Sequence, residues 1–435
     1  MTTGKALNGK PYAGNPHVRF DEGEVAPCTA EASLRRRPCR RQPEGCASRC
    51  AATPRRGSLL YKKLVVFAVA AAVCVAANGA RAVEPFPDGA RVVFFGDSIT
   101  QNGVAVTWVA AHYRKMFPNS NVRMFNVGIS GGSVGAAHLY FDSWLAPLKP
   151  THVVVGFGVN DAGAAVFRKD AKDKSAELKR IESVAASFEK RYCSLLDRIE
   201  ALGAKVILRT PTPYDEFSKG PTAAGKTRVN AWAGRNDAQR RMAESVRKIA
   251  AVRNLPLVDD FAAFSPYMNG EDVPFEADRV HPDKQGLWRL ARNLLSAQGL
   301  EIEKFRSIDE VAEEVGLTAW RAASVRLSNL LSAEFLIVRN ESLDLNAKFA
   351  KVRGWLAKNE KRKGANPYVV ARARQFLEDK PCEAELRAEE EAAWGRSLAS
   401  HRSANSKSSA AVPTVQNGKG DSEWCAKLSS AELAN

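Results

Sequence analysis

Cysteine is scarce where a folded core is expected. Of the eight cysteines, five precede residue 82, and the others are the widely spaced Cys193, Cys382 and Cys425. Three separated cysteines do not form a disulfide framework. The earlier Cys39, Cys46 and Cys50 do not follow a zinc-binding spacing, and no histidine lies near them to complete a site. We therefore expect no structural metal site and no disulfide scaffold.

A hydrophobic run long enough to span a membrane is also missing. The longest apolar stretch, residues 64–77, is shorter than the about 20 residues that a spanning helix needs. It follows a lysine pair and precedes an A-x-A cleavage site that ends at Ala82. Residues 59–82 therefore predict a signal peptide and an exported protein, periplasmic or extracellular, without a stable membrane span after cleavage. An uncleaved anchor is the alternative.

The segment before this signal has no sign of regular structure. Residues 1–58 contain scattered cysteines and an arginine-rich stretch, and they have no hydrophobic period. A signal peptide is expected near the start of a chain, yet no methionine lies between Met1 and Met116. Our hypothesis is that translation starts at a non-Met codon near Leu59 or Leu60. Residues 1–58 would then be non-structural or misannotated sequence.

Beyond the N-terminal segment there is little excess of positive charge. The formal net charge is +16, and residues 1–82 supply +9 of it with 14 Lys/Arg against 5 Asp/Glu. After residue 82 no basic run is interleaved with aromatic residues, as a nucleic-acid-binding surface would have. We expect no nucleic-acid partner and interpret the remaining charge as a solvated, mildly basic surface.

Residues 88–299 alternate short apolar runs with helical patterns. We expect strands at 91–95, 121–125, 152–156, 205–209 and 257–258, and helices at 104–117, 134–145, 176–202, 230–252 and 283–295. Strands that alternate with helices indicate a parallel sheet covered on both faces. The predicted fold class is α/β, a flavodoxin-like three-layer sandwich with a parallel five-stranded sheet, in which ligands bind beyond the carboxyl ends of the strands.

Residues 300–400 differ in composition and predict a C-terminal helical extension. They are rich in Ala, Glu, Lys, Arg and Leu, and we expect helices at 307–315, 317–338, 343–360 and 367–396. This extension would be an appendage packed on the α/β domain, a cap over its site, or a surface that docks a protein partner. Residues 401–435 are expected to be a mostly disordered tail.

A serine stands at the carboxyl end of the first expected strand. Gly96, Asp97 and Ser98 follow the apolar run and precede a helix. Such a turn exposes the serine hydroxyl, and a helix N-terminus favours developing negative charge, so Ser98 is a candidate nucleophile. The alternative is that Asp97 and Ser98 only cap the helix.

Among the six histidines, His281 has the best position to act as a base. It lies in a loop ahead of the last α/β helix, with Asp278 three residues before it. A carboxylate at this spacing can fix the tautomer of an imidazole and stabilise its charged form. His138 lies in an early helix and is not excluded by composition. The alternative is a surface aspartate beside a partly buried histidine.

Two further loops offer donors for an oxyanion. Gly131 lies in a glycine-rich loop after the second strand, where backbone N–H groups can approach a ligand. Asn160, after the third strand, carries a side-chain N–H. The alternatives are a plain turn around Gly131 and an Asx turn at Asn160.

Together these blocks resemble the SGNH hydrolases, the GDSL-like lipase/acylhydrolase and esterase family, over about residues 90–298. The fourth residue of the family's first motif, often Leu, is Ile99 here. The matching residues are Ser98, Gly131, Asn160, Asp278 and His281. The resemblance implies a Ser98–His281–Asp278 triad, an oxyanion hole made by the Ser98 and Gly131 N–H groups and the Asn160 side chain, an acyl-enzyme, and no cofactor.

An exported member of this family would act on esters outside the cell, either small molecules or polysaccharides. The absence of a long apolar lid favours a short-acyl (acetyl) ester of a carbohydrate as substrate. Asp97 and Tyr214 are candidates for the substrate pocket, and Trp108 and Trp144 are either stacking faces or core residues. The open alternatives are a lysophospholipase or lipase, an O-acetyltransferase, and a non-catalytic carbohydrate-binding relative.

Overall fold

A computed structural model describes residues 81–407 except 163–173, 223–224, 228–231, 233, 269, 271–272, 340–341 and 364. The segment 1–58, nearly all of the expected signal peptide, and the tail beyond residue 407 lie outside the described residues. Within the described part of the chain, no helix is both long and apolar enough to cross a bilayer.

A parallel sheet forms the centre of the α/β domain. Its strands are β1 (Arg91–Gly96), β2 (Arg123–Gly128), β3 (His152–Gly156), β4 (Lys205–Arg209) and β5 (Leu257–Val258). Their order in the sheet is β2-β1-β3-β4-β5, and every neighbouring pair is parallel. This is the flavodoxin-like order, so the predicted fold class is confirmed.

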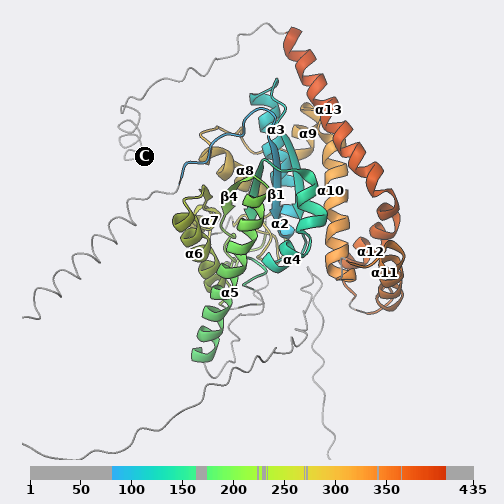
Figure 1. The fold of residues 1–435 in the computed structure, drawn as a ribbon. Helices are drawn as coiled ribbons and strands as arrows, with labels where there is room; N and C mark the ends of the chain where they lie inside the picture. Colours follow the sequence, from blue (N-terminus) through green and yellow to red (C-terminus); the bar gives the residue numbers. More distant parts are fainter. Residues whose placement is uncertain are drawn as a thin grey trace, which may run out of the picture.

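Alternate residues of the buried strands point to opposite faces, and helices cover both. Val92 and Phe94 pack into one core cluster, whereas Val93 and Phe95 pack into another. The helices of the first face are α3 (Val104–Met116) and α8 (Lys284–Ala297). Those of the second face are α4 (Val134–Leu139), α5 (Lys174–Ala201) and α6 (Arg235–Arg253). Both layers surround the sheet in Figure 1.

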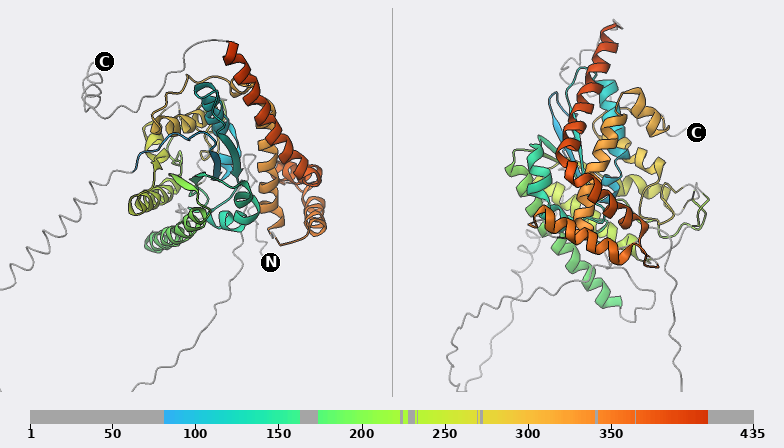
Figure 2. Two further views of the ribbon diagram at one scale, coloured as in Figure 1. Left: turned by 45° about the horizontal axis from the view of Figure 1, so that its top comes forward. Right: turned by 90° about the vertical axis from the view of Figure 1, so that its right-hand side faces the viewer.

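The C-terminal residues form a group of helices beside the β2 edge of the sheet. The group contains α9 (Ile308–Glu314), α10 (Thr318–Ala333), the π-helical turn η4 (Glu334–Val338), α11 (Leu345–Asn359), α12 (Pro367–Asp379), the 3₁₀ turn η5 (Lys380–Cys382) and α13 (Glu383–Lys407). α10 contacts β2, and α13 runs along α10. Figures 1 and 2 show these orange and red helices together on one side of the molecule.

Three expected helix boundaries were wrong. The expected helix 134–145 ends at Leu139 and is followed by a π turn, η1 (Phe141–Leu145), and a 3₁₀ turn, η2 (Ala146–Leu148). Arg198 donates a hydrogen bond of 3.0 Å to the His138 carbonyl, which draws that group out of the helical ladder. The expected helix 367–396 is interrupted by η5, because Pro381 cannot continue a helix. Residues 401–407, expected in the tail, belong to α13.

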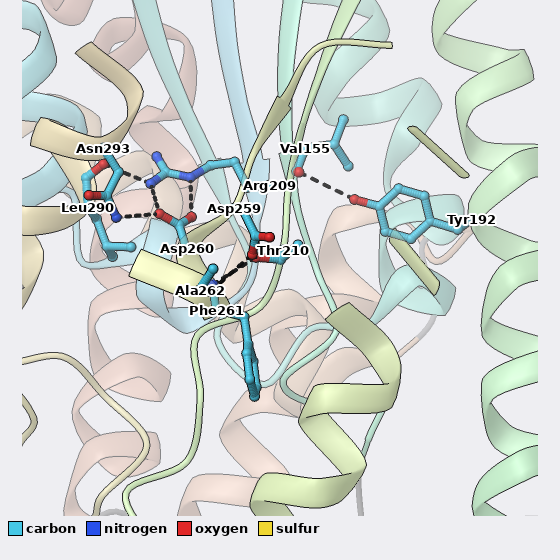
Figure 3. A network of polar contacts seen from close by, with 10 residues as sticks. All are labelled: Val155, Tyr192, Arg209, Thr210, Asp259, Asp260, Phe261, Ala262, Leu290 and Asn293. Atoms are coloured by element: carbon cyan, nitrogen blue, oxygen red, sulfur yellow. Dashed lines mark hydrogen bonds and ion pairs between the residues drawn. The ribbon is translucent and has the colours of Figure 1, made fainter. Parts of the chain in front are cut away.

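A buried ion pair fixes the carboxyl end of β4 to the following helices. The Arg209 guanidinium donates to both carboxylate oxygens of Asp260, at 2.7 and 2.8 Å, and to the Leu290 carbonyl. Asn293 donates to the same carboxylate. Figure 3 shows this network, which connects β4 with α7 (Asp260–Phe264) and α8. Because the loop containing Asp278 runs between these two helices, the network sets the position of both ends of that loop.

Candidate active site

Glycines at the ends of adjacent strands allow a short helix to lie close above the sheet. Gly96 of β1 pairs in register with Gly128 of β2 and with Gly156 of β3. The short helix α2 (Ser98–Gln101) follows at once. A Cβ atom at Gly128 would lie 2.1 Å from the backbone nitrogen of Gln101, a distance that no side chain tolerates. The glycines therefore place Ser98 directly above the edge of the sheet.

Ser98, His281 and Asp278 form a continuous chain of hydrogen bonds. The Ser98 hydroxyl lies 2.7 Å from His281 Nε2, and His281 Nδ1 lies 2.7 Å from Asp278 Oδ2. The other oxygen of Asp278 accepts hydrogen bonds from the backbone N–H groups of Val280 and His281, each at 3.0 Å. The carboxylate is thus held in place while it orients the imidazole, which is the geometry of a nucleophile, its base and an orienting acid.

The charges around His281 increase its affinity for a proton. Burial of the imidazole lowers its pKa, but the hydrogen bond and negative charge of Asp278, together with the charge of Asp97, outweigh this effect. The net result is that the pKa of His281 lies above its ordinary value. Burial in turn raises the pKa of Asp97 to about 6, although its hydrogen bond from the Ile99 N–H and the nearby His281 and Arg235 act in the opposite direction.

The loop that contains Asp278 and His281 is anchored by the arginine between them. Arg279 adopts a left-handed backbone conformation, with φ of 66°. Its buried guanidinium donates to the carbonyls of Asp215, Glu216 and Ser218, at 2.7, 3.1 and 2.6 Å. This role cannot be predicted from the sequence, since a single arginine in a loop gives no local signal of its partners.

Gly131 and Asn160 come together on either side of the strand that leads to Ser98. Gly131 follows β2 and Asn160 follows β3, and β1 lies between these strands. Gly131 has a φ of 74°, a conformation that favours glycine. The Asn160 amide donates one hydrogen bond, of 2.9 Å, to the Gly132 carbonyl. A side-chain amide has a second N–H, which remains for a ligand.

A pocket with a volume of about 330 Å³ begins at these two residues. It is lined by Gly131, Ser133, Gly135, Ala136, Leu139, Asn160 and Phe335. Asp161, next to Asn160, accepts hydrogen bonds from the Val134 N–H and so holds the first turn of α4 against the pocket. Phe335 belongs to η4 of the C-terminal helices. Its place in the pocket cannot be predicted from the sequence, because nothing in the sequence relates residue 335 to the loop around residue 131.

The two candidates for the substrate pocket, Asp97 and Tyr214, do not line the pocket that begins at Gly131 and Asn160. Asp97 is 3% exposed and lines a separate internal cavity of about 50 Å³, and Tyr214 is 1% exposed. Tyr214 packs against Trp232, and the buried guanidinium of Arg235 lies over both rings. Both side chains are buried, and neither is among the residues that line the pocket beside Gly131 and Asn160.

The remaining candidates, two tryptophans and one histidine, contribute to packing and hydrogen bonding within the fold. Trp108 and Trp144 are buried core residues and not stacking faces of a binding site. His138 lies 2.9 Å from the carbonyl of Arg191 through its Nε2 atom, away from Ser98. In the described ranges, no group of three or more His, Cys, Asp and Glu residues is arranged to hold a metal ion.

Comparisons with known proteins find one matching family profile and several similar proteins. Residues 94–289 match the profile of the GDSL-like lipase/acylhydrolase family. An acetylxylan esterase of Geobacillus stearothermophilus is 27% identical over 229 residues, which are 49% of this chain and 95% of that protein. A solved structure of that bacterium's acetylxylan esterase aligns with a TM-score of 0.40 and 24% identity, and covers 51% of this chain and 99% of its own.

Another solved structure extends the likeness of the fold. A gut microbial diltiazem-metabolizing enzyme aligns with a TM-score of 0.58 at 18% identity, and covers 75% of this chain and 97% of its own. This coverage exceeds the α/β domain, so the shared fold includes part of the C-terminal helices.

The flavodoxin-like sheet order, the serine after β1 and the Asp-His loop before α8 are those of the SGNH class of hydrolases. With the match over residues 94–289, we conclude that the chain carries a domain of the GDSL-like lipase/acylhydrolase family. It is a carboxylic ester hydrolase.

Proposed function

We propose that this protein is an exported esterase that removes short acyl groups, above all acetyl, from carbohydrates through a Ser98–His281–Asp278 triad. The observation that carries the proposal is the pair of 2.7 Å contacts that link the Ser98 hydroxyl, the His281 ring and the Asp278 carboxylate. These three side chains lie at the carboxyl edge of the sheet, where α/β proteins bind their ligands.

In the first half of the reaction, the Ser98 oxygen attacks the ester carbonyl carbon while His281 Nε2 takes the hydroxyl proton. The carbonyl oxygen becomes an oxyanion, which accepts hydrogen bonds from the Ser98 and Gly131 N–H groups and from the Asn160 amide. The Ser98 N–H lies in the first turn of α2, where helical N–H groups have no partner within the helix. The C–O bond then breaks, and His281 returns the proton to the leaving alcohol.

In the second half, water replaces the alcohol. His281 takes a proton from the water as its oxygen attacks the acyl carbon of the acyl-enzyme. The bond between the acyl carbon and the Ser98 oxygen breaks, and the proton passes back to Ser98. Asp278 stabilises the charged imidazolium through its hydrogen bond and its charge, and these raise the pKa of His281.

The acetylated carbohydrate is proposed on two grounds. The relative that is 27% identical is an acetylxylan esterase. The pocket beside Gly131 and Asn160 is open and has an aromatic wall, as a site for a sugar ring requires. Export rests on the predicted signal peptide alone, and an exported protein is expected to begin at Val83 when its N-terminus is determined by mass spectrometry.

The decisive measurement compares wild type with Ser98→Ala on p-nitrophenyl esters of increasing chain length and on acetylated xylo-oligosaccharides. We expect the substitution to lower kcat/KM at least about a thousandfold, because removal of a triad nucleophile leaves only binding and the oxyanion donors. Ser120→Ala, which removes a hydroxyl near Asp88 away from the triad, is the matched control and should retain full activity.

Each rival function predicts a different result. A lipase or lysophospholipase would prefer long acyl chains, and an O-acetyltransferase would pass the acetyl group to an added sugar in place of water. Equal inactivity of folded wild type and Ser98→Ala on all these esters would contradict the proposal and favour a binding protein.

A further inference from the structure

The C-terminal π turn η4 lies directly against the loop that carries Gly131. A Cβ atom built at Gly131 would be 3.5 Å from Leu336 Cδ2 and 3.9 Å from Phe335 Cε1. Both side chains are therefore in van der Waals reach of the proposed oxyanion loop. Leu336 is buried, but Phe335 is partly exposed and lines the pocket. π-helical turns inside helices are frequent at functional sites.

One ring contact of Phe335 and two ion pairs of the preceding residue hold Phe335 in this position. Its ring meets the Tyr140 ring edge-on, with centroids 6.3 Å apart. The preceding Glu334 is 2% exposed and pairs with Lys380 at 2.7 Å and with Lys348 at 3.3 Å. These lysines come from η5 and α11, so two other elements of the C-terminal group fix the backbone of η4.

The pocket has the character of a site for a flat, mostly apolar group. None of its lining residues in the described part of the chain is charged, and three of them are Gly131, Gly135 and Ala136. Leu139, which is 40% exposed, and Phe335 supply the apolar walls. A volume of about 330 Å³ is far more than an acetyl group requires. The pocket therefore fits the larger part of the substrate, which for an acetate ester is the alcohol.

We propose that Phe335 determines specificity for the alcohol part of the ester by packing its ring against a cyclic alcohol, such as the C–H face of a sugar. This inference rests on the proposed esterase function and assigns to the C-terminal helices a part in substrate binding. A ring beside the oxyanion residues contacts the alcohol equally before and during the attack on the carbonyl. It therefore contributes to KM more than to kcat.

The test is Phe335→Ala in the full-length protein, assayed on ethyl acetate, cyclohexyl acetate and an acetylated methyl xyloside. We expect KM for the two ring alcohols to rise about threefold to tenfold, the range for the loss of one aromatic packing contact. The kcat/KM for ethyl acetate should stay within about twofold. Phe335→Tyr keeps the ring and should restore both KM values.

A matched control separates this effect from a loss of packing. Phe349 is also a partly buried phenylalanine of the C-terminal helices, and it packs on Phe376 outside the pocket. Phe349→Ala should lower the melting temperature without changing the ratio of KM between cyclohexyl and ethyl acetate. An unchanged ratio of KM between cyclohexyl and ethyl acetate in Phe335→Ala would overturn the inference.

The same data distinguish the two proposals. Wild-type activity on simple esters without activity on the acetylated xyloside would contradict the carbohydrate substrate only, and the cyclohexyl-to-ethyl comparison would still decide the role of Phe335. If the wild-type protein hydrolyses none of these esters, the proposed function itself is contradicted, and with it the role of Phe335.

Discussion

The basicity of His281 is set by two carboxylates that act in different ways. Asp278 accepts a direct hydrogen bond from the ring, whereas Asp97 acts on the imidazole by its charge from a buried position behind Ser98. The same burial raises the pKa of Asp97 to about 6, so its charge is present only above that pH. Asp97 therefore strengthens the proposed base in neutral solution and less so in acid.

Replacement of Asp97 by asparagine should move the acid limb of the pH–activity profile. The proposed base must be neutral to accept the Ser98 proton, so kcat/KM rises with pH through the pKa of His281. Because the charge of Asp97 raises that pKa, Asp97→Asn should shift the midpoint of the limb to lower pH, by less than about one pH unit. Profiles of kcat/KM between acid and neutral pH would measure the shift.

The control for this prediction is a carboxylate distant from the site. Asp142 pairs with Arg198 on the surface, and Asp142→Asn should leave the midpoint unchanged. A midpoint that stays the same or rises in Asp97→Asn would show that the charge of Asp97 does not act on His281.

Sequence could predict the residues that recur as local patterns but not those that act across the fold. Ser98 follows a strand, and Asp278 precedes His281 by three residues, so each has a recognisable local setting. Arg279 and Phe335 contribute through partners more than sixty and two hundred residues away, respectively. No local pattern encodes such contacts, since they depend on how separate elements pack.

At the scale of elements, α10 supports the proposed oxyanion loop from below. The Ser328 hydroxyl donates to the Gly128 carbonyl at 2.7 Å, and the Ser332 hydroxyl accepts from the Ser130 N–H at 2.9 Å. Both serines are fully buried. The helix thus binds the backbone on both sides of Ile129 and limits the positions that Gly131 can take.

Loss of this support should affect the reaction more than binding. Ser332→Ala leaves the buried Ser130 N–H without its acceptor, which costs about 1–3 kcal/mol of stability. A small displacement of an oxyanion donor weakens transition-state stabilisation, so kcat for p-nitrophenyl acetate should fall roughly tenfold with a smaller change in KM. Steady-state kinetics and thermal unfolding of the same preparation would measure both effects.

Another buried serine of the C-terminal helices provides the comparison. Ser397 donates to the Val315 carbonyl at 2.6 Å, away from the loop. Ser397→Ala should lower stability by a similar amount but leave kcat unchanged. Equal kinetic losses in the two variants would mean that α10 contributes only general stability.

The type of each helix and strand could be predicted from the sequence more reliably than the residues at which it begins and ends. Hydrophobic periodicity located the five strands and most helices, because burial on one face leaves a repeating pattern. It did not reveal that the helix beginning at Thr318 changes to a π turn at Glu334. That change accompanies the ion pairs of Glu334 with Lys348 and Lys380, which are tertiary contacts.

For the whole molecule, the α/β domain and the C-terminal helices share their cores. One core cluster combines Val93 and Phe95 of the sheet with Leu327 and Leu330 of α10. The cluster on the other face combines Val92 with Trp320 and Trp394. The change in composition near residue 300 indicated a separate helical segment, but composition does not show which surfaces are buried against one another.

We therefore predict that the chain does not fold when it ends at Gly299. Such a truncation removes the helices that cover part of both core clusters and exposes apolar side chains of the α/β domain to water. Each large apolar side chain that is exposed costs about 1.5–3 kcal/mol. Five of them together cost about 8–15 kcal/mol, which is as large as the typical total stability of about 5–15 kcal/mol. The longer chain should unfold in a single transition by calorimetry, whereas the truncated one should be insoluble or lack a cooperative transition. A soluble truncated protein with cooperative unfolding and Ser98-dependent activity would show that the α/β domain is independent and that the helices are an appendage.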